Sequence, residues 1–158
     1  MRINLKDRLD LPAELNRMNF LGIGVEVGSL RGEFAAYLLK SWKGKRLYLV
    51  NAWKHAPGAR DANNADPEGQ LDNMSTAFRA VYEFSSRAVI VRDSSVMASQ
   101  LFPDGALDFV YIDAAHDYES VKDDLRAWVP KVRAGGLVIG DDYTYDTCGH
   151  GKKDGVDI

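Results

Sequence analysis

Three aspartates and a histidine near the C-terminal end of the sequence have types and spacings that could perform chemistry. Asp113 and His116 follow one apolar segment, and Asp141 and Asp142 follow the next. Three carboxylates that converge without a basic partner raise one another's pKa values, and a divalent metal relieves that repulsion. An all-oxygen ligand set favours Mg²⁺, Ca²⁺ or Mn²⁺. The alternative is that Asp142 caps a turn, Asp141 faces water and only Asp113 acts.

His116 lies three residues after Asp113. Because imidazole titrates near neutral pH, it is a suitable base for removing a proton from a substrate hydroxyl. The alternative role is to cap the helix that is expected to begin near Asp117. We favour catalysis for His116.

A turn with two glycines follows the first apolar segment and reads Glu26-Val27-Gly28-Ser29-Leu30-Arg31-Gly32. Gly28 permits a sharp turn and lets a ligand approach the main chain, so Gly28→Val is expected to block a ligand. The spacing does not fit the G-x-G-x-x-G pattern of dinucleotide sites, and Glu26 would repel a diphosphate. An acid there suits a cofactor that carries an ammonium or a sulfonium. Alternatively, both glycines serve only a tight turn between a strand and a helix.

Five apolar segments that alternate with helical patterns must position these residues. The expected strands are 23–27, 47–50, 88–91, 107–112 and 137–139, the last introduced by Gly135-Gly136. Strands that alternate with helices predict a Rossmann-like α/β fold, an open, mainly parallel sheet with helices on both faces.

Apolar residues at helical spacing predict the helices. A first helix is expected to start at Asp10-Leu11-Pro12, and 53–69 is expected to be a long loop. Tyr118 and Trp128 are expected in the core. The apolar positions of the remaining helices are Phe34, Ala35, Leu38 and Leu39; Leu71, Met74, Phe78 and Val81; Val96, Met97 and Leu101; and Tyr118, Val121, Leu125, Trp128 and Val129.

Polar residues stand directly after each expected strand. Open α/β sheets bind ligands at the carboxyl ends of their strands, where the strand order reverses. That edge is therefore the predicted site. Its residues are Glu26, Gly28, Ser29 and Gly32 after the first strand, Asn51, Ala52 and Trp53 after the second, Asp93 and Ser94 after the third, Asp113 and His116 after the fourth, and Asp141 and Asp142 after the fifth. Trp53 could pack over an adenine or anchor a hinge.

Length and composition indicate one ordinary domain, 1–158, with residues 1–21 as a helical extension at the N-terminus. The net charge of −3 argues against a nucleic-acid partner. The single cysteine, the lack of an apolar run that could span a bilayer and the lack of a signal peptide predict a soluble cytoplasmic protein without a membrane partner.

Four blocks of this sequence resemble the class I S-adenosylmethionine-dependent methyltransferases, and more narrowly the macrocin O-methyltransferase-like branch. They are GVEVGSLRGEFA, YLVNAWKH, DFVYIDAAHDYESVKDDL and GGLVIGDDY, and they lie between residues 22 and 143. The resemblance implies a metal at the aspartate cluster. It also implies that Glu26, Gly28 and Ser29 hold the methionine part of the cofactor, that Asp93 and Ser94 lie near the adenine, and that Asp113 lines the reaction centre.

Two features depart from that family. Asn51 stands where its members usually carry an acid that binds both ribose hydroxyls, so we expect weaker cofactor binding or more binding by the main chain. Residues 144–158 form an incomplete C-terminal segment, so the last strands of the usual fold are expected to be missing. The sheet edge that this leaves favours pairing into a homo-oligomer.

The leading hypothesis is an O-methyltransferase that moves a methyl group from S-adenosylmethionine to a small-molecule hydroxyl, with a sugar as one candidate and Mg²⁺ assisting. One alternative is a nicotinamide-dependent oxidoreductase of Rossmann type. The other is a catalytically silent module that binds S-adenosylmethionine, which Asn51 and the short C-terminus suggest. Calorimetry with S-adenosylhomocysteine or NADH, with and without Mg²⁺, distinguishes the three.

Overall fold

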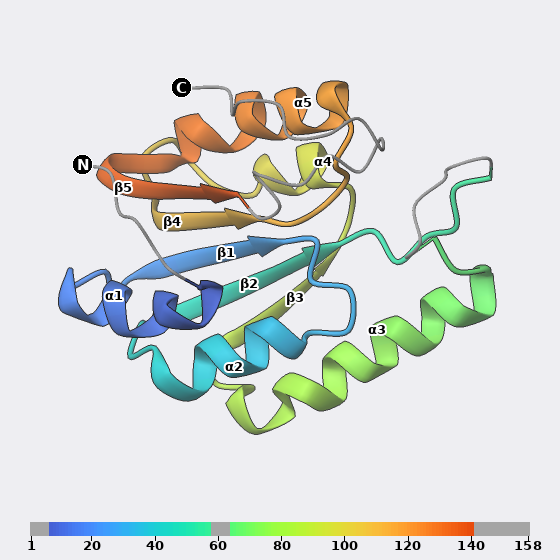
Figure 1. Ribbon diagram of the computed structural model, residues 1–158, viewed down its shortest axis with the longest axis horizontal. Coiled ribbons are helices and arrows are strands. Elements are labelled where there is room, and N and C mark those ends of the chain that lie inside the picture. Colours follow the sequence, from blue (N-terminus) through green and yellow to red (C-terminus); the bar gives the residue numbers. More distant parts are fainter. Residues whose placement is uncertain (1–6, 58–63, 141–158) are drawn as a thin grey trace.

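A computed structural model of the chain describes residues 7–57 and 64–140, and its centre is a parallel sheet of five strands (Figure 1). The strand order is β3-β2-β1-β4-β5, and every neighbouring pair is parallel. The strands are β1 (Ile23–Val27), β2 (Arg46–Asn51), β3 (Ala88–Arg92), β4 (Leu107–Ile112) and β5 (Val132–Gly140). The order reverses between β1 and β4, so the ligand crevice of such a fold is expected at their carboxyl ends. The predicted fold class is confirmed.

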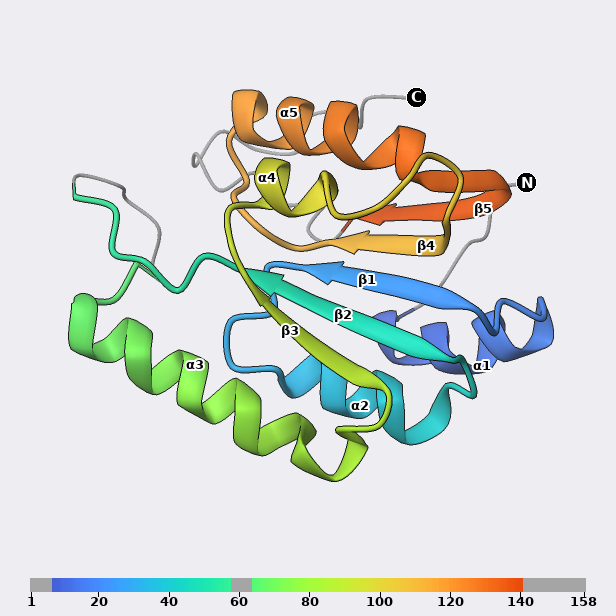
Figure 2. The ribbon, with the colours of Figure 1, turned by 180° about the vertical axis from the view of Figure 1, so that it is seen from behind.

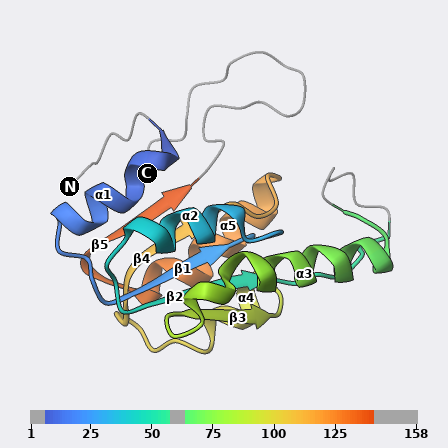
Figure 3. The same cartoon turned by 90° about the horizontal axis from the view of Figure 1, so that it is seen from below.

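Helices cover both faces of this sheet, as predicted (Figure 2). Those before β3 lie on one face, and the two that follow it lie on the other. Figure 3 shows α1 beside α2, with which it is in contact. The helices are α1 (Leu11–Arg17), α2 (Glu33–Ser41), α3 (Pro67–Val81), α4 (Ser95–Ser99) and α5 (Tyr118–Trp128), and the 3₁₀ turns are η1 (Arg8–Asp10), η2 (Tyr82–Phe84) and η3 (Val129–Lys131). Across both described ranges, each helix is too short or too polar to cross a bilayer.

The core is divided into two clusters because side chains of a strand alternate between faces of the sheet. From β1, Val25 and Val27 point to the face that α4 and α5 cover. From β2, Leu47 and Leu49 point to the opposite face, where α1 and α2 pack. Fully burying one such side chain contributes about 1.5–3 kcal/mol. A shift of one residue in any strand would move its buried side chains to the other face, so this packing fixes the register of the sheet. The register in turn determines which residues lie at the carboxyl ends of the strands.

The apolar positions of the predicted helices are buried only in part. Trp128 is buried as expected, but Tyr118 is 72% exposed because it stands in the first turn of α5. In α3, Leu71 and Phe78 are about half exposed, and Ala77 packs in their place. In α4 the buried residues are Ala98 and Ser99, whereas Val96, Met97 and the nearby Leu101 are exposed.

Two boundaries also differ from the expectation. The loop after β2 is shorter than predicted, because α3 begins at Pro67 and the Asp66 side chain accepts a hydrogen bond from the Gly69 amide (2.8 Å). Strand β5 begins at Val132, so Gly135-Gly136 lies inside it rather than before it. There Gly135 has a φ of +77°, and the pairing with β4 shifts register between Leu107 and Phe109.

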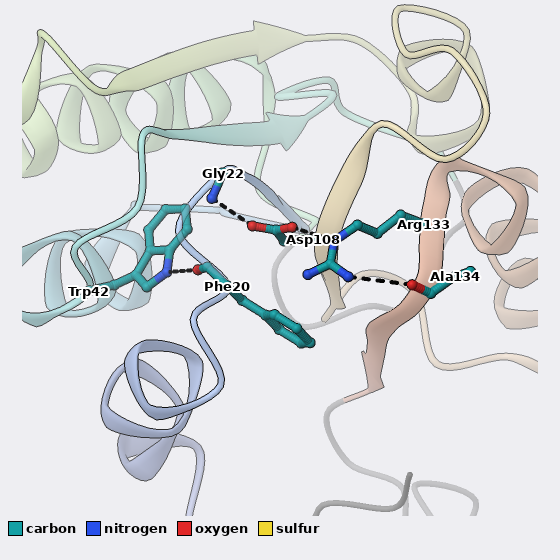
Figure 4. A network of polar contacts seen from close by, with 6 residues as sticks. All are labelled: Phe20, Gly22, Trp42, Asp108, Arg133 and Ala134. Carbon is teal, nitrogen blue, oxygen red and sulfur yellow. Dashed lines mark hydrogen bonds and ion pairs between the residues drawn. The ribbon is translucent and has the colours of Figure 1, made fainter.

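A polar network joins three strands at their amino ends, opposite the predicted site (Figure 4). The Asp108 carboxylate accepts hydrogen bonds from the Gly22 amide and from Arg133 Nε, both at 2.6 Å. The Arg133 guanidinium also lies over the Phe20 ring, 4.6 Å from its centroid. In the same region, the Trp42 indole donates to the Phe20 carbonyl at 2.7 Å. These contacts connect the starts of β1, β4 and β5.

Candidate active site

The loops after β1 and β4 contact each other directly at the point where the strand order reverses. Gly28 has a φ of +94°, and a Cβ atom there would lie 1.8 Å from the Asp113 carbonyl oxygen. The Asp113 amide donates to the Val27 carbonyl (2.8 Å), and the Gly28 amide donates to that of Val50 (2.9 Å). A glycine is therefore required at position 28 because the main chain of Asp113 lies so close to it, and not because of a ligand. Gly28→Val would disturb the fold, so the test that the sequence suggested does not isolate ligand binding.

Glu26 carries a buried carboxyl group at the end of β1. Its exposed fraction is 3%, and the Ser29 hydroxyl donates to it at 3.0 Å. The pKa of Glu26 is raised to about 7, mainly because burial disfavours the charged form; the hydrogen bond from Ser29 and the charge of Arg8 lower the pKa, and the charge of Asp113 contributes to the rise. A cation placed beside Glu26 would favour its charged form, because opposite charges stabilise each other in a poorly solvated place.

Arg8 is a member of this site that the sequence reasoning missed. Its Nη1 lies 3.6 Å from Asp113 Oδ2, and its guanidinium lies over the Phe34 ring, 5.3 Å from the centroid. The expectation that Asp113 would lack a basic partner is therefore wrong. The cause is the distance along the chain: Arg8 reaches Asp113 only through tertiary packing, and no spacing pattern links the two positions.

The predicted metal site is only partly within the described residues. Asp113 stands at the end of β4, whereas Asp141 and Asp142 lie outside the ranges that the structure describes. Within those ranges no group of three or more His, Cys, Asp or Glu residues could hold a metal ion. The Mg²⁺ site stays a prediction.

His116 is exposed in the loop between β4 and α5. The capping role goes to its neighbour Asp117, whose side chain accepts a hydrogen bond from the Ser120 amide (3.1 Å). The hydrogen bonds from Ser120 hold the pKa of Asp117 below its usual range. The alternative in which His116 caps α5 is therefore wrong, and its catalytic role stays a prediction.

An open cleft of about 390 Å³ lies beyond the ends of β2 and β3. Its lining residues are Ala52, Lys54, Arg92, Asp93 and Ser94. Three of them, Ala52, Asp93 and Ser94, belong to the predicted cofactor set, and the two cations do not. Asn51 of β2 is the in-register partner of Arg92 of β3. A basic residue therefore lies beside the position at which members of the family usually carry an acid. The cleft includes Asp93 and Ser94, which the family resemblance implies lie near the adenine of a cofactor.

At two other predicted cofactor residues, Trp53 and Gly32, protein atoms occupy the space beside the residue. The Trp53 side chain is 1% exposed and its indole donates to the Leu30 carbonyl at 2.6 Å, which favours the anchoring interpretation. Gly32 begins α2 with a φ of +73°, and a Cβ atom there would lie 3.1 Å from Ala77 of α3. Any contact of Trp53 with a cofactor would involve its main chain.

The folds of solved methyltransferases resemble this one. A protein from Staphylococcus aureus assigned as a caffeoyl-CoA O-methyltransferase aligns with a TM-score of 0.64 and 20% identity, over 92% of this chain and 61% of that one. An O-methyltransferase from Bacillus cereus in complex with SAH gives 0.61 and 15%, over 90% and 59%. An rRNA methylase from Streptococcus thermophilus gives 0.58 and 9%, over 86% and 71%.

At these identities the likeness concerns the fold, and the chain spans about three fifths of the length of the first two structures. No curated protein matches the sequence. A family model described as a methyltransferase domain matches residues 25–143, from β1 to just beyond β5. Since that match includes most of the chain and every strand of the sheet, the protein belongs to this methyltransferase-domain family.

Proposed function

We propose that this domain transfers a methyl group from S-adenosylmethionine to a hydroxyl of a small molecule. The observation that carries the proposal is the pair of carboxyl groups, Glu26 and Asp113, at the point where the strand order reverses. The match to the methyltransferase family supports the assignment of the cofactor.

The charges at this point suit a cationic ligand. When bound, S-adenosylmethionine supplies a methyl group on a positively charged sulfur, and its amino-acid part carries an ammonium group. The buried Glu26 and the half-buried Asp113 offer negative charge on adjacent strands. A dinucleotide would instead bring a diphosphate to the same place, where both carboxylates would repel it. This favours the methyltransferase over the nicotinamide-dependent oxidoreductase.

The adenosine would occupy the cleft beyond β2 and β3. Ala52, Asp93 and Ser94 line it, and Asn51 at the end of β2 would bind the ribose hydroxyls. An amide can donate and accept, but its bonds to hydroxyls are weaker than those of a carboxylate. We therefore expect a lower affinity for the cofactor than an acid at position 51 would give.

The acceptor would meet the methyl group near the loop that carries Asp113 and His116. His116 would take the proton of the acceptor hydroxyl, because histidine is the side chain most often used as a general base and His116 is exposed in the same loop as Asp113. A divalent ion bound by Asp113, Asp141 and Asp142 would lower the pKa of that hydroxyl. More specifically, we propose a sugar as the acceptor, as in the macrocin-like branch that the sequence resembles. The net charge of −3 favours a small acceptor over RNA.

Isothermal titration calorimetry with S-adenosylhomocysteine and with NADH, each with and without Mg²⁺, tests this function. We expect S-adenosylhomocysteine to bind and NADH not to bind. Binding of NADH alone would replace the proposal by the oxidoreductase. Binding of S-adenosylhomocysteine without methyl transfer to any of a panel of sugars and phenols would instead support the silent module.

A further inference from the structure

The segment that carries Arg8 is held firmly against the body of the domain. The Asp7 side chain accepts a hydrogen bond from the Leu9 amide (2.9 Å), which fixes the turn η1. The Tyr37 hydroxyl of α2 donates to the Leu9 carbonyl at 2.9 Å. Immediately after this turn, Leu11 and Leu15 of α1 are fully buried in the core. The position of Arg8 is therefore set by the hydrogen bonds of the turn η1 and by the packing of α1, which follows it.

This segment brings a guanidinium to the two carboxyl groups of the candidate site. Arg8 Nη1 lies 3.6 Å from Asp113 Oδ2, and the charge of Arg8 also acts on the buried Glu26. The distance to Asp113 is that of an ion pair and is longer than a hydrogen bond between nitrogen and oxygen. The ring of Phe34 supports the guanidinium from one side. Arg8 is 47% exposed, so a ligand at the strand ends can reach it.

The site thus presents two carboxyl groups and one guanidinium that act on one another where β1 and β4 end. The amino-acid end of S-adenosylmethionine carries the complementary set, namely a sulfonium, an ammonium and one carboxylate. Arg is the side chain best suited to a carboxylate, because its planar donors match both oxygens. We infer that Arg8 binds the α-carboxylate of the cofactor, while Glu26 and Asp113 face its cationic groups. This inference rests on the proposed function and adds a binding residue to it.

A purely structural role makes a different prediction. If Arg8 only neutralises Asp113 and holds η1 in place, its loss would affect every ligand of the site equally. If it binds the carboxylate, its loss would affect only ligands that carry one. Two probes separate these roles: S-adenosylhomocysteine and its decarboxylated analogue, which keeps the ammonium and the adenosine and lacks only the carboxylate.

The experiment is calorimetry of both probes with the full chain and with Arg8→Gln, Arg8→Lys and a control, Arg17→Gln. Arg17 lies in the same N-terminal segment, and its Nε donates to the Glu14 carboxylate at 2.9 Å. A charge-assisted hydrogen bond corresponds to roughly tenfold to hundredfold in affinity. We expect the unaltered chain to prefer S-adenosylhomocysteine by that factor, Arg8→Gln to abolish the preference, Arg8→Lys to keep part of it, and Arg17→Gln to keep all of it.

The outcomes distinguish the two levels of the proposal. An equal loss of affinity for both probes in Arg8→Gln, or an unchanged preference, overturns the role of Arg8 and leaves the proposed function standing. If the unaltered chain binds neither probe, the proposed function fails and this inference fails with it. Thermal unfolding of each variant accompanies the titrations, so that a variant that does not fold is recognised. If Arg8→Gln does not fold, Arg8→Lys, which keeps the charge, takes its place. A reduced preference for S-adenosylhomocysteine over the decarboxylated analogue then supports the role of Arg8, and an unchanged preference overturns it.

Discussion

The indole N–H of Trp53 donates a 2.6 Å hydrogen bond to the Leu30 carbonyl, and both residues have a positive φ, 43° for Trp53 and 36° for Leu30. The bond joins the loop after β2 to the loop after β1, and both loops carry predicted cofactor residues. Positive φ values cost non-glycine residues about 1–3 kcal/mol each, and they persist only where surrounding contacts enforce them. The buried indole and its hydrogen bond supply such contacts, so we expect the two loops to depend on each other.

Trp53→Phe tests this dependence, since phenylalanine keeps a buried ring but loses the donor. The unsatisfied Leu30 carbonyl should lower the free energy of unfolding by about 1–3 kcal/mol, measured in urea, and the affinity for S-adenosylhomocysteine should fall as well. Trp42→Phe is the matched control, because it removes a similar bond, to the Phe20 carbonyl, at the other end of the sheet. It should lower stability without changing affinity. Equal effects of both variants on affinity would contradict the anchoring role of Trp53.

Glu26 should make the stability of the free protein decrease between pH 4.5 and pH 7. Its pKa is raised by burial to about 7 in the folded chain, from 4.5 in the unfolded chain, so the folded state binds more protons in this interval. The stability that the neutral form provides is complete below pH 4.5 and is lost as the pH rises through 7. The full loss amounts to at most about 3 kcal/mol. Urea unfolding of the free protein and of Glu26→Gln at pH 5 and pH 8 measures it, and Glu26→Gln should lose less stability over that interval. An equal pH dependence of the two proteins would refute the assignment.

Asn51→Asp should strengthen the binding of S-adenosylhomocysteine, because a carboxylate accepts stronger hydrogen bonds from ribose hydroxyls than an amide does. We expect an increase of roughly tenfold, read by calorimetry. Arg92 pairs with position 51 in register and could compete for the new carboxylate. The double variant Asn51→Asp/Arg92→Gln therefore belongs to the experiment. If neither variant binds more tightly than the unaltered chain, Asn51 does not contact the ribose.

The Asp108 network should matter for stability and not for ligand binding. Asp108→Ala leaves the Gly22 amide and the Arg133 guanidinium without the carboxylate that both contact at 2.6 Å. We expect a loss of about 2–3 kcal/mol in the free energy of unfolding. Because the network joins the amino ends of the strands, the affinity for S-adenosylhomocysteine at the carboxyl ends should stay the same (Figure 4). A large loss of affinity in a variant that remains folded would show that the two ends are coupled.

The sheet could be predicted from the sequence because each strand is a short apolar run between turn residues, a local pattern. The same pattern located the edge at which Glu26, Asn51, Asp93 and Asp113 stand. Contacts between distant parts of the chain could not be predicted in this way. Arg8 reaches Asp113 from another part of the sequence, and Gly28 is required by the main chain of Asp113 rather than by a ligand.

Errors on the helices have a related cause. Periodicity shows that α3 and α4 have an apolar side, but the exposure of that side depends on what packs against it. Leu71 and Met97 are about half exposed in the described part of the chain, whereas the small Ala77 and Ala98 are fully buried. Where a helix packs closely against its neighbours, only small residues fit at the contact. The hydrophobicity pattern of a sequence does not show where such close contacts occur.

Asp113 and His116 come from one loop, yet we expect their substitutions to act on different steps. Asp113→Asn should remove any dependence of methyl transfer on Mg²⁺ and weaken Mg²⁺ binding in a calorimetric titration, because a neutral amide is a poorer ligand. His116→Ala should leave Mg²⁺ binding unchanged and slow turnover by roughly 10²–10⁴, the usual contribution of a general base. Since Asp113→Asn also removes the ion pair with Arg8, its unfolding must be compared with that of Arg8→Gln. Full activity in excess EDTA would exclude the metal, and an undiminished rate in His116→Ala would exclude His116 as the base.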